Sequence, residues 1–66
     1  MDPAIVRRRL AALHGQVWDS FTLVRDFDVI RFTPPLVHVC RRSDGAMGSV
    51  TFQHVPRFYW GWHASG

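Results

Sequence analysis

Histidine and cysteine are the residues of this chain that could hold a metal ion. They are His38, Cys40 and His54, with His14 or His63 as a fourth ligand. Zinc favours these side chains, but it needs them to converge on one point. If the strands that carry them form a hairpin, His38 and Cys40 lie on one face and His54 on the other. The chain also lacks CxxC and HxxxH spacings, so we expect no metal ion and no cofactor.

Nucleophilic catalysis would require Cys40 as the nucleophile and His38 as its base. Residues two apart on a strand have Cβ atoms about 7 Å apart, which is too far for a direct hydrogen bond. The carboxylates are all aspartates, at Asp2, Asp19, Asp26, Asp28 and Asp44. Asp26 and Asp28 could share a face, but two carboxylates supply too few oxygen ligands for a cation. We therefore expect a protein that is not an enzyme.

Arginine supplies all the basic side chains, and the formal net charge is +3. Guanidinium groups bind phosphates and carboxylates through two hydrogen bonds, and they stack on aromatic rings. Arg7, Arg8 and Arg9 form a run, but a helix turns about 100° per residue and spreads them around its axis. Arg8 then lies opposite the apolar side of the helix. Two interpretations remain open for it, a solvated face and a face that contacts phosphate.

A second group of polar residues flanks the strongest turn signal of the chain, Asp44-Gly45. This turn predicts a hairpin in which Val37 and Val39 share a buried face with Val50 and Phe52. The opposite face then carries His38, Cys40, Arg42, Ser49, Thr51 and Gln53. These groups can bond phosphate, base or peptide. The solvated side of an antiparallel sheet has the same composition, so that interpretation also stays open.

Aromatic residues are concentrated in the stretch from 57 to 63. On a strand, Phe58, Trp60 and Trp62 share one face, and Arg57 and Tyr59 share the other. We expect the first face to complete the core and the second to present Tyr59 beside Arg57. Aromatic rings next to arginine suit base stacking on single strands. They suit a protein interface equally well.

The first element that positions these residues is an N-terminal helix over about residues 2–14. Asp2 is a good N-cap, Pro3 suits the first helical position, and Gly15 is placed to stop the helix. Met1 and Val6 stand in hydrophobic-staple positions. The residues that form an apolar stripe at helical spacing are Val6, Leu10 and Leu13.

Five strands are expected after the helix, over about residues 17–24, 27–33, 36–42, 48–54 and 57–62. These segments are rich in β-branched and aromatic residues, and turn residues or prolines separate most of them. The boundary at Arg25-Asp26 has neither glycine nor proline. Residues 17–33 could therefore form one long bent strand, and Trp18 to Val24 could instead be helical.

The whole chain, residues 1–66, is expected to form a single small α+β domain, with the helix followed by a mostly antiparallel sheet. A small SH3-like open barrel fits this order of elements. Cys40 is the one cysteine, so an internal disulfide is excluded. No signal peptide is visible, and no apolar run approaches the roughly 18 residues that span a bilayer. We expect no membrane partner and a cytoplasmic location.

Two functions fit this composition, and the first is preferred. It is a small non-catalytic module that binds nucleic acid, RNA or single-stranded DNA, through arginines and exposed aromatic rings. The second is an adaptor, inhibitor or subunit from a phage or bacterium that binds protein through the aromatic C-terminal strand or forms a homodimer. The residues expected to contact the partner are Arg8, His38, Arg42, Thr51, Gln53, Arg57 and Tyr59.

Overall fold

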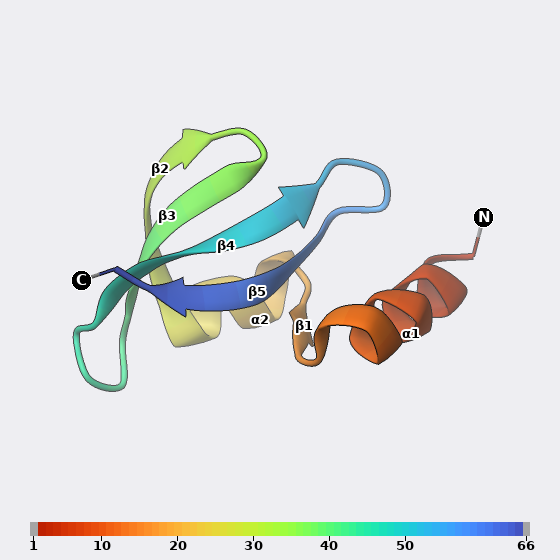
Figure 1. The fold of residues 1–66 in the computed structure, drawn as a ribbon, viewed down its shortest axis with the longest axis horizontal. Helices are drawn as coiled ribbons and strands as arrows, with labels where there is room; N and C mark the ends of the chain where they lie inside the picture. The colour runs from red at the N-terminus through yellow and green to blue at the C-terminus, as the bar shows by residue number, and fades with distance from the viewer. Residues whose placement is uncertain (1, 66) are drawn as a thin grey trace.

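The computed structural model describes residues 2–65, which fold into two helices and five strands (Figure 1). In chain order they are α1 (Pro3–His14), β1 (Val17–Trp18), α2 (Ser20–Asp26), β2 (Phe27–Thr33), β3 (Leu36–Arg41), β4 (Met47–Gln53) and β5 (Phe58–Ala64). The strands form one antiparallel sheet in the order β1-β5-β4-β3-β2. The α+β class is therefore confirmed. β1 and β2 lie at opposite ends of this order, so the sheet is not closed into a barrel.

The expected N-terminal helix is confirmed, and its capping residues act as predicted. The Asp2 side chain accepts a hydrogen bond of 2.9 Å from the Ala4 amide. Gly15 follows the last turn with φ at 84°, a conformation that glycine adopts without strain. Met1, the expected staple partner of Val6, lies outside the described residues.

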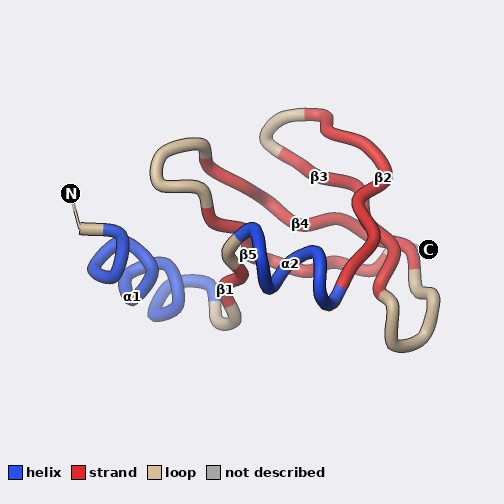
Figure 2. Tube along the Cα trace, turned by 180° about the vertical axis from the view of Figure 1, so that it is seen from behind, coloured by secondary structure: helices blue, strands red, loops and turns tan. Residues whose placement is uncertain are grey.

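α1 projects from the end of the molecule near β1 (Figures 1 and 2). None of its twelve residues is buried, and Leu13, part of the apolar stripe, is 72 % exposed. The helix is held to the sheet mainly through two side chains. Arg7 donates a hydrogen bond of 3.1 Å to the Val17 carbonyl, and the His14 ring stacks on Trp60 at 5.3 Å. The apolar stripe contributes little to the core.

The strand expected over residues 17–24 is wrong beyond Trp18, because the following residues form α2. One long bent strand over residues 17–33 is wrong for the same reason. The helical alternative for this segment comes closest to the structure. α2 lies against part of one face of the sheet (Figure 2), so helical side chains lie over the core there.

A capping box is the reason that α2 forms. Asp19 accepts a hydrogen bond of 2.8 Å from the Thr22 amide, and the Thr22 hydroxyl accepts one of 3.0 Å from the Asp19 amide. These two bonds satisfy amides that a helix N-terminus otherwise leaves unpaired. The cap places Leu23, which is 1 % exposed, against the sheet. Burial of this side chain then stabilises a helix of only seven residues.

The hairpin between β3 and β4 has the expected register. Val37 pairs with Val50, and the valines and phenylalanine expected on the buried face are all buried: Val37, Val39, Val50 and Phe52. At the turn, the Asp44 side chain accepts a hydrogen bond of 3.0 Å from the Ala46 amide. Gly45 adopts φ at 72° there, as the turn signal requires.

A bulge in the pairing of β4 with β5 changes which aromatic rings face the core. The register shifts between Ser49 and Thr51, and Gly61 adopts φ at 69° at this point. Before the bulge, Tyr59 packs in the core and is 4 % exposed. After the bulge, Trp62 packs against the same core.

Two expectations for the aromatic strand are therefore wrong. Tyr59 is not presented at the surface beside Arg57, because it is buried. Trp62 does not share a face with Phe58 and Trp60, because the bulge at Gly61 reverses the alternation of side chains.

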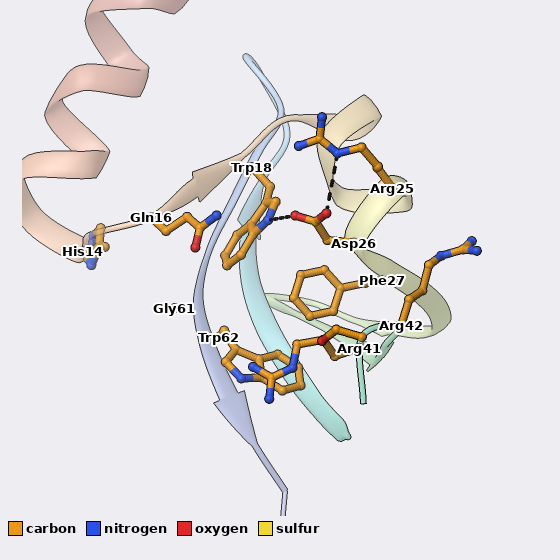
Figure 3. A pocket seen from close by; sticks show the side chains of 11 residues that line it. His14, Gln16, Trp18, Arg25, Asp26, Phe27, Arg41, Arg42, Gly61 and Trp62 are labelled. Carbon is orange, nitrogen blue, oxygen red and sulfur yellow. Dashed lines mark hydrogen bonds and ion pairs between the residues drawn. The ribbon is translucent and has the colours of Figure 1, made fainter. Parts of the chain in front are cut away.

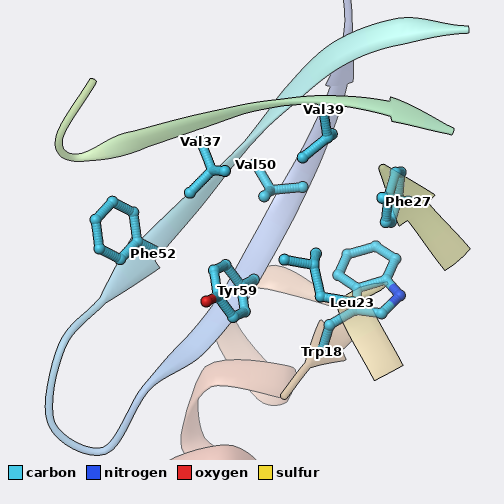
Figure 4. Close-up of a cluster of buried hydrophobic side chains, with 8 residues drawn as sticks. All are labelled: Trp18, Leu23, Phe27, Val37, Val39, Val50, Phe52 and Tyr59. Atoms are coloured by element: carbon cyan, nitrogen blue, oxygen red, sulfur yellow. The ribbon is translucent and has the colours of Figure 1, made fainter. Parts of the chain in front are cut away.

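The core lies between α2 and one face of the sheet (Figure 4). Its buried members are Trp18, Leu23, Phe27, Val37, Val39, Val50, Phe52 and Tyr59. Neither of the two helices within residues 2–65 has the length and apolar content needed to cross a membrane.

Candidate functional site

The residues expected to contact a partner are distributed over several elements. Arg8 lies on the exposed side of α1, and Arg57 lies in the turn between β4 and β5. His38 and Thr51 are half-buried, and the register places them on the sheet face opposite the core. The structure therefore brings part of the expected polar face together but does not join it to Tyr59, which is buried.

Two residues of this polar face are already hydrogen-bonded within the chain. The His38 ring lies 2.7 Å from the Thr33 hydroxyl through Nε2. The Gln53 amide donates a hydrogen bond of 2.9 Å to the Pro56 carbonyl. These contacts give both side chains a structural role, and their role in partner binding stays a prediction.

The arginines of the expected site also have neighbours in the chain. Arg42 forms an ion pair of 2.7 Å with Asp28, and both side chains are about half exposed. The Arg57 guanidinium lies 5.5 Å from the centre of the Phe52 ring and contacts His54 Nδ1 at 3.2 Å. Arg57 is therefore held against an aromatic ring, but Tyr59 is not that ring.

A pocket of about 700 Å³ lies beside the second half of β5 (Figure 3). β1 pairs with β5 only at Trp60 and Tyr59, so the edge of β5 from Gly61 onward is free of β1. The other walls come from the end of α2, the start of β2, the turn after β3, and the junction of α1 with β1, where His14 and Gln16 lie. The short β1 and the helix that follows it thus create a recess at one end of the core.

Aromatic rings form the floor of the pocket. Trp18 and Phe27 pack edge to face with centroids 5.3 Å apart, and Phe27 and Trp62 lie 5.1 Å apart. Trp18 and Phe27 are buried, whereas Trp62 is only half-buried. The Arg41 guanidinium lies 5.0 Å from the centre of the Trp62 ring. Phe27, Trp62 and Arg41 therefore pack one after another at the open end of the core.

Three arginines stand around this floor, namely Arg25, Arg41 and Arg42. Arg41 is fixed by Asp44, which accepts hydrogen bonds of 3.1 and 2.6 Å from its Nε and Nη2. The hydrogen bond from Arg41 lowers the pKa of the Asp44 carboxyl from 3.8 to about 2. The same contact raises the pKa of the Arg41 guanidinium. Arg41 is thus both charged and oriented.

Asp26 is the carboxylate among the residues that line the pocket. Its Oδ2 accepts a hydrogen bond of 3.0 Å from the indole nitrogen of Trp18, and its Oδ1 lies 3.5 Å from Arg25 Nε. The wall therefore combines one oriented carboxylate with an excess of cationic groups. Such a pocket can accept a planar ring with anionic groups attached to it.

Of the residues expected from the sequence to contact a partner, Arg42 lines this pocket. Sequence reasoning missed Arg25, Asp26, Arg41 and Trp62. The spacing of Asp19 and Thr22 was the available signal, because a capping box there starts a helix that ends at Arg25 and Asp26. The inward turn of Trp62 depends on the bulge at Gly61, which no local pattern indicates.

No protein-family model, curated protein or solved structure matches this chain. The described residues, 2–65, contain no group of three or more histidine, cysteine or acidic side chains that could hold a metal ion. The pocket itself is thus the feature from which a function can be argued.

Proposed function

We propose that this protein is a cytoplasmic, non-catalytic module that binds single-stranded nucleic acid, RNA or DNA. The observation that supports the proposal most strongly is the pocket beside β5, where arginines surround an aromatic floor. A nucleobase stacks at the Trp62–Arg41 end of this floor, and the adjoining phosphates contact the surrounding arginines.

Base stacking is assigned to the outer face of the Arg41 guanidinium, which the Trp62 ring supports from the other side. Bases stack on aromatic side chains and on the plane of a guanidinium group, whatever their sequence. Arg41 already lies over the Trp62 ring at 5.0 Å, and Asp44 holds its guanidinium in place. The stacking surface is therefore formed before any ligand binds, which reduces the entropic cost of binding.

Phosphate binding is assigned to Arg25 and Arg42. Their side chains are 72 % and 53 % exposed, and their ion pairs with Asp26 and Asp28 lie in solvent-accessible positions. Exposed ion pairs of this kind contribute at most about 1 kcal/mol each, so a phosphate can compete with the aspartates for both guanidinium groups. The remaining N–H groups of each guanidinium can also bond a phosphate without breaking the ion pair with the aspartate.

The proposal is tested by titrating a fluorescein-labelled oligouridylate of about eight nucleotides with the protein, at increasing salt. We expect log K to fall linearly with log salt, with a slope of about −0.7 for each phosphate contacted. Arg25→Gln and Arg42→Gln should each weaken binding and make the slope shallower. Arg31→Gln removes the same charge from an exposed position on β2. This control should change both the affinity and the slope little. Absence of binding at low salt would contradict the proposal.

A second function, self-association, is favoured by one observation on β2. This strand is at the edge of the sheet, and it exposes Val29, Ile30 and Phe32 at 38 %, 56 % and 46 %. An edge strand with exposed apolar side chains can pair with the same strand of a second copy. Sedimentation velocity over a wide range of protein concentrations tests this: a dimer that Ile30→Arg disrupts would support it, and a monomer throughout would exclude it.

A further inference from the structure

Arg25 and Asp26 end α2 at the mouth of the pocket and place hydrogen-bond donors beside a carboxylate (Figure 3). Arg25 approaches Asp26 Oδ1 through Nε at 3.5 Å. Among residues 2–65, Arg25 makes no other ion pair. Its two Nη groups therefore remain available to a ligand. The two side chains together present acceptors and donors in adjacent positions.

The Asp26 carboxylate is oriented but not saturated. The indole of Trp18, a ring only 6 % exposed, donates to Oδ2 at 3.0 Å and fixes the plane of the carboxylate. An ionised carboxylate has about four acceptor positions on its two oxygens. Its side chain is 39 % exposed, so a ligand in the pocket can reach the remaining positions.

We propose that this pair makes the pocket selective for guanine, an inference that rests on the proposed function. The Watson–Crick edge of guanine presents, in order, an acceptor at O6 and donors at N1 and N2. Asp26 accepts from the N1–H and N2–H groups, and Arg25 donates to O6. The two side chains thus supply the same order of donors and acceptors as a paired cytosine does.

The other bases lack this match. Adenine and cytosine each place a ring-nitrogen acceptor beside an amino group, and uracil and thymine flank one N–H with two carbonyls. Each of these bases would put an acceptor against the Asp26 carboxylate or leave its second oxygen unpaired, which carries an energetic cost. Arg25 has two Nη groups, so one can donate to O6 while the other contacts the adjoining phosphate.

Oligouridylates of about eight nucleotides, each with one central guanosine, inosine, adenosine or cytidine, test the inference with the unmodified protein. Inosine keeps O6 and N1–H but lacks the N2 amino group. We expect the guanosine oligonucleotide to bind about tenfold more tightly than the adenosine one, with inosine between them. This comparison does not depend on the folding of any variant.

Asp26→Asn then identifies the residue responsible. Asparagine keeps an oxygen for the Trp18 indole but loses the second acceptor, so the preference for guanosine should disappear. Binding of the uniform oligouridylate should persist or strengthen, because a negative charge near the phosphates is removed. The control is Asp2→Asn, which removes the same charge at the N-cap of α1, where asparagine caps equally well. It should leave the preference intact.

The outcomes separate this inference from the function on which it rests. Equal affinities for the guanosine, adenosine and cytidine oligonucleotides would overturn guanine selectivity but leave single-strand binding in place. Retention of the preference in Asp26→Asn would overturn the assignment to Asp26. Failure of every oligonucleotide to bind would overturn the proposed function and, with it, the guanine site.

Discussion

Single residues of the pocket have roles that their neighbours determine. Trp62 is half-buried, with Phe27 packed at 5.1 Å and the Arg41 guanidinium at 5.0 Å. Trp60, two residues earlier, pairs with Thr51 on the opposite side of the sheet and does not line the pocket, although it stacks on His14, which does. The two tryptophans belong to one strand but are placed in different environments. Substitutions at these two positions should therefore have different effects on binding.

Trp62→Leu should weaken the binding of an oligonucleotide by about 1–3 kcal/mol, the usual contribution of one stacked base. Leucine keeps part of the apolar contact with Phe27 but removes the aromatic ring on which the Arg41 guanidinium lies. Fluorescence anisotropy with a labelled oligouridylate measures the change. Trp60→Leu is the matched control and should reduce the affinity much less, because Trp60 touches the pocket only through His14. An equal loss of affinity in both variants would contradict the assignment of stacking to the Trp62–Arg41 end of the floor.

Asp44 should make the turn beside the pocket sensitive to acid. The pKa of this carboxyl is lowered from 3.8 to about 2, first by the hydrogen bond from Arg41. A group whose pKa is lowered on folding stabilises the folded state above its ordinary pKa, and this stabilisation is lost as the pH falls from about 4 to about 2. The melting temperature of Asp44→Asn should therefore lie below that of the wild type at neutral pH and approach it near pH 2. A constant difference across this range would contradict the prediction.

At the scale of elements, the sequence predicted what local patterns control. The caps of α1 and the β3–β4 hairpin were predicted because Asp2, Gly15 and the Asp44-Gly45 turn act through neighbouring backbone groups. The β-branched and aromatic composition of residues 17–24 indicated a strand, but a cap at Asp19 and burial of Leu23 outweighed it. The candidate pocket could not be predicted, because it requires α2 and the β5 bulge together.

The capping box should be the main local determinant of α2. Asp19→Ala removes the acceptor for the Thr22 amide and also the partly exposed ion pair with Arg7. The substitution should therefore lower the free energy of unfolding by about 1 kcal/mol. Ser20→Ala, at the exposed first residue of the helix, should change it by less than about 0.5 kcal/mol. Urea denaturation measures both. If both substitutions lowered the free energy of unfolding equally, the cap at Asp19 would not be the main determinant of α2.

At the scale of the whole molecule, the sheet has free backbone at both sides. On one side β2 is the edge strand, and on the other β1 covers only the first part of β5. The pocket occupies the uncovered part of β5, beneath the end of α2. One end of the core therefore stays open, and the aromatic floor and the arginines meet there.

The most direct test of the central claim, that this pocket binds single-stranded nucleic acid, uses the three indole N–H signals in an ¹H–¹⁵N correlation spectrum. Titration with an unlabelled oligonucleotide should shift the Trp62 signal most and the Trp18 signal next, because both rings form the pocket floor. The Trp60 signal should shift least, because its ring is on the opposite side of the sheet and touches the pocket only through His14. The predicted shifts should saturate together with the binding isotherm. Saturable binding with shifts confined to Trp60, or with all three signals unmoved, would contradict the claim.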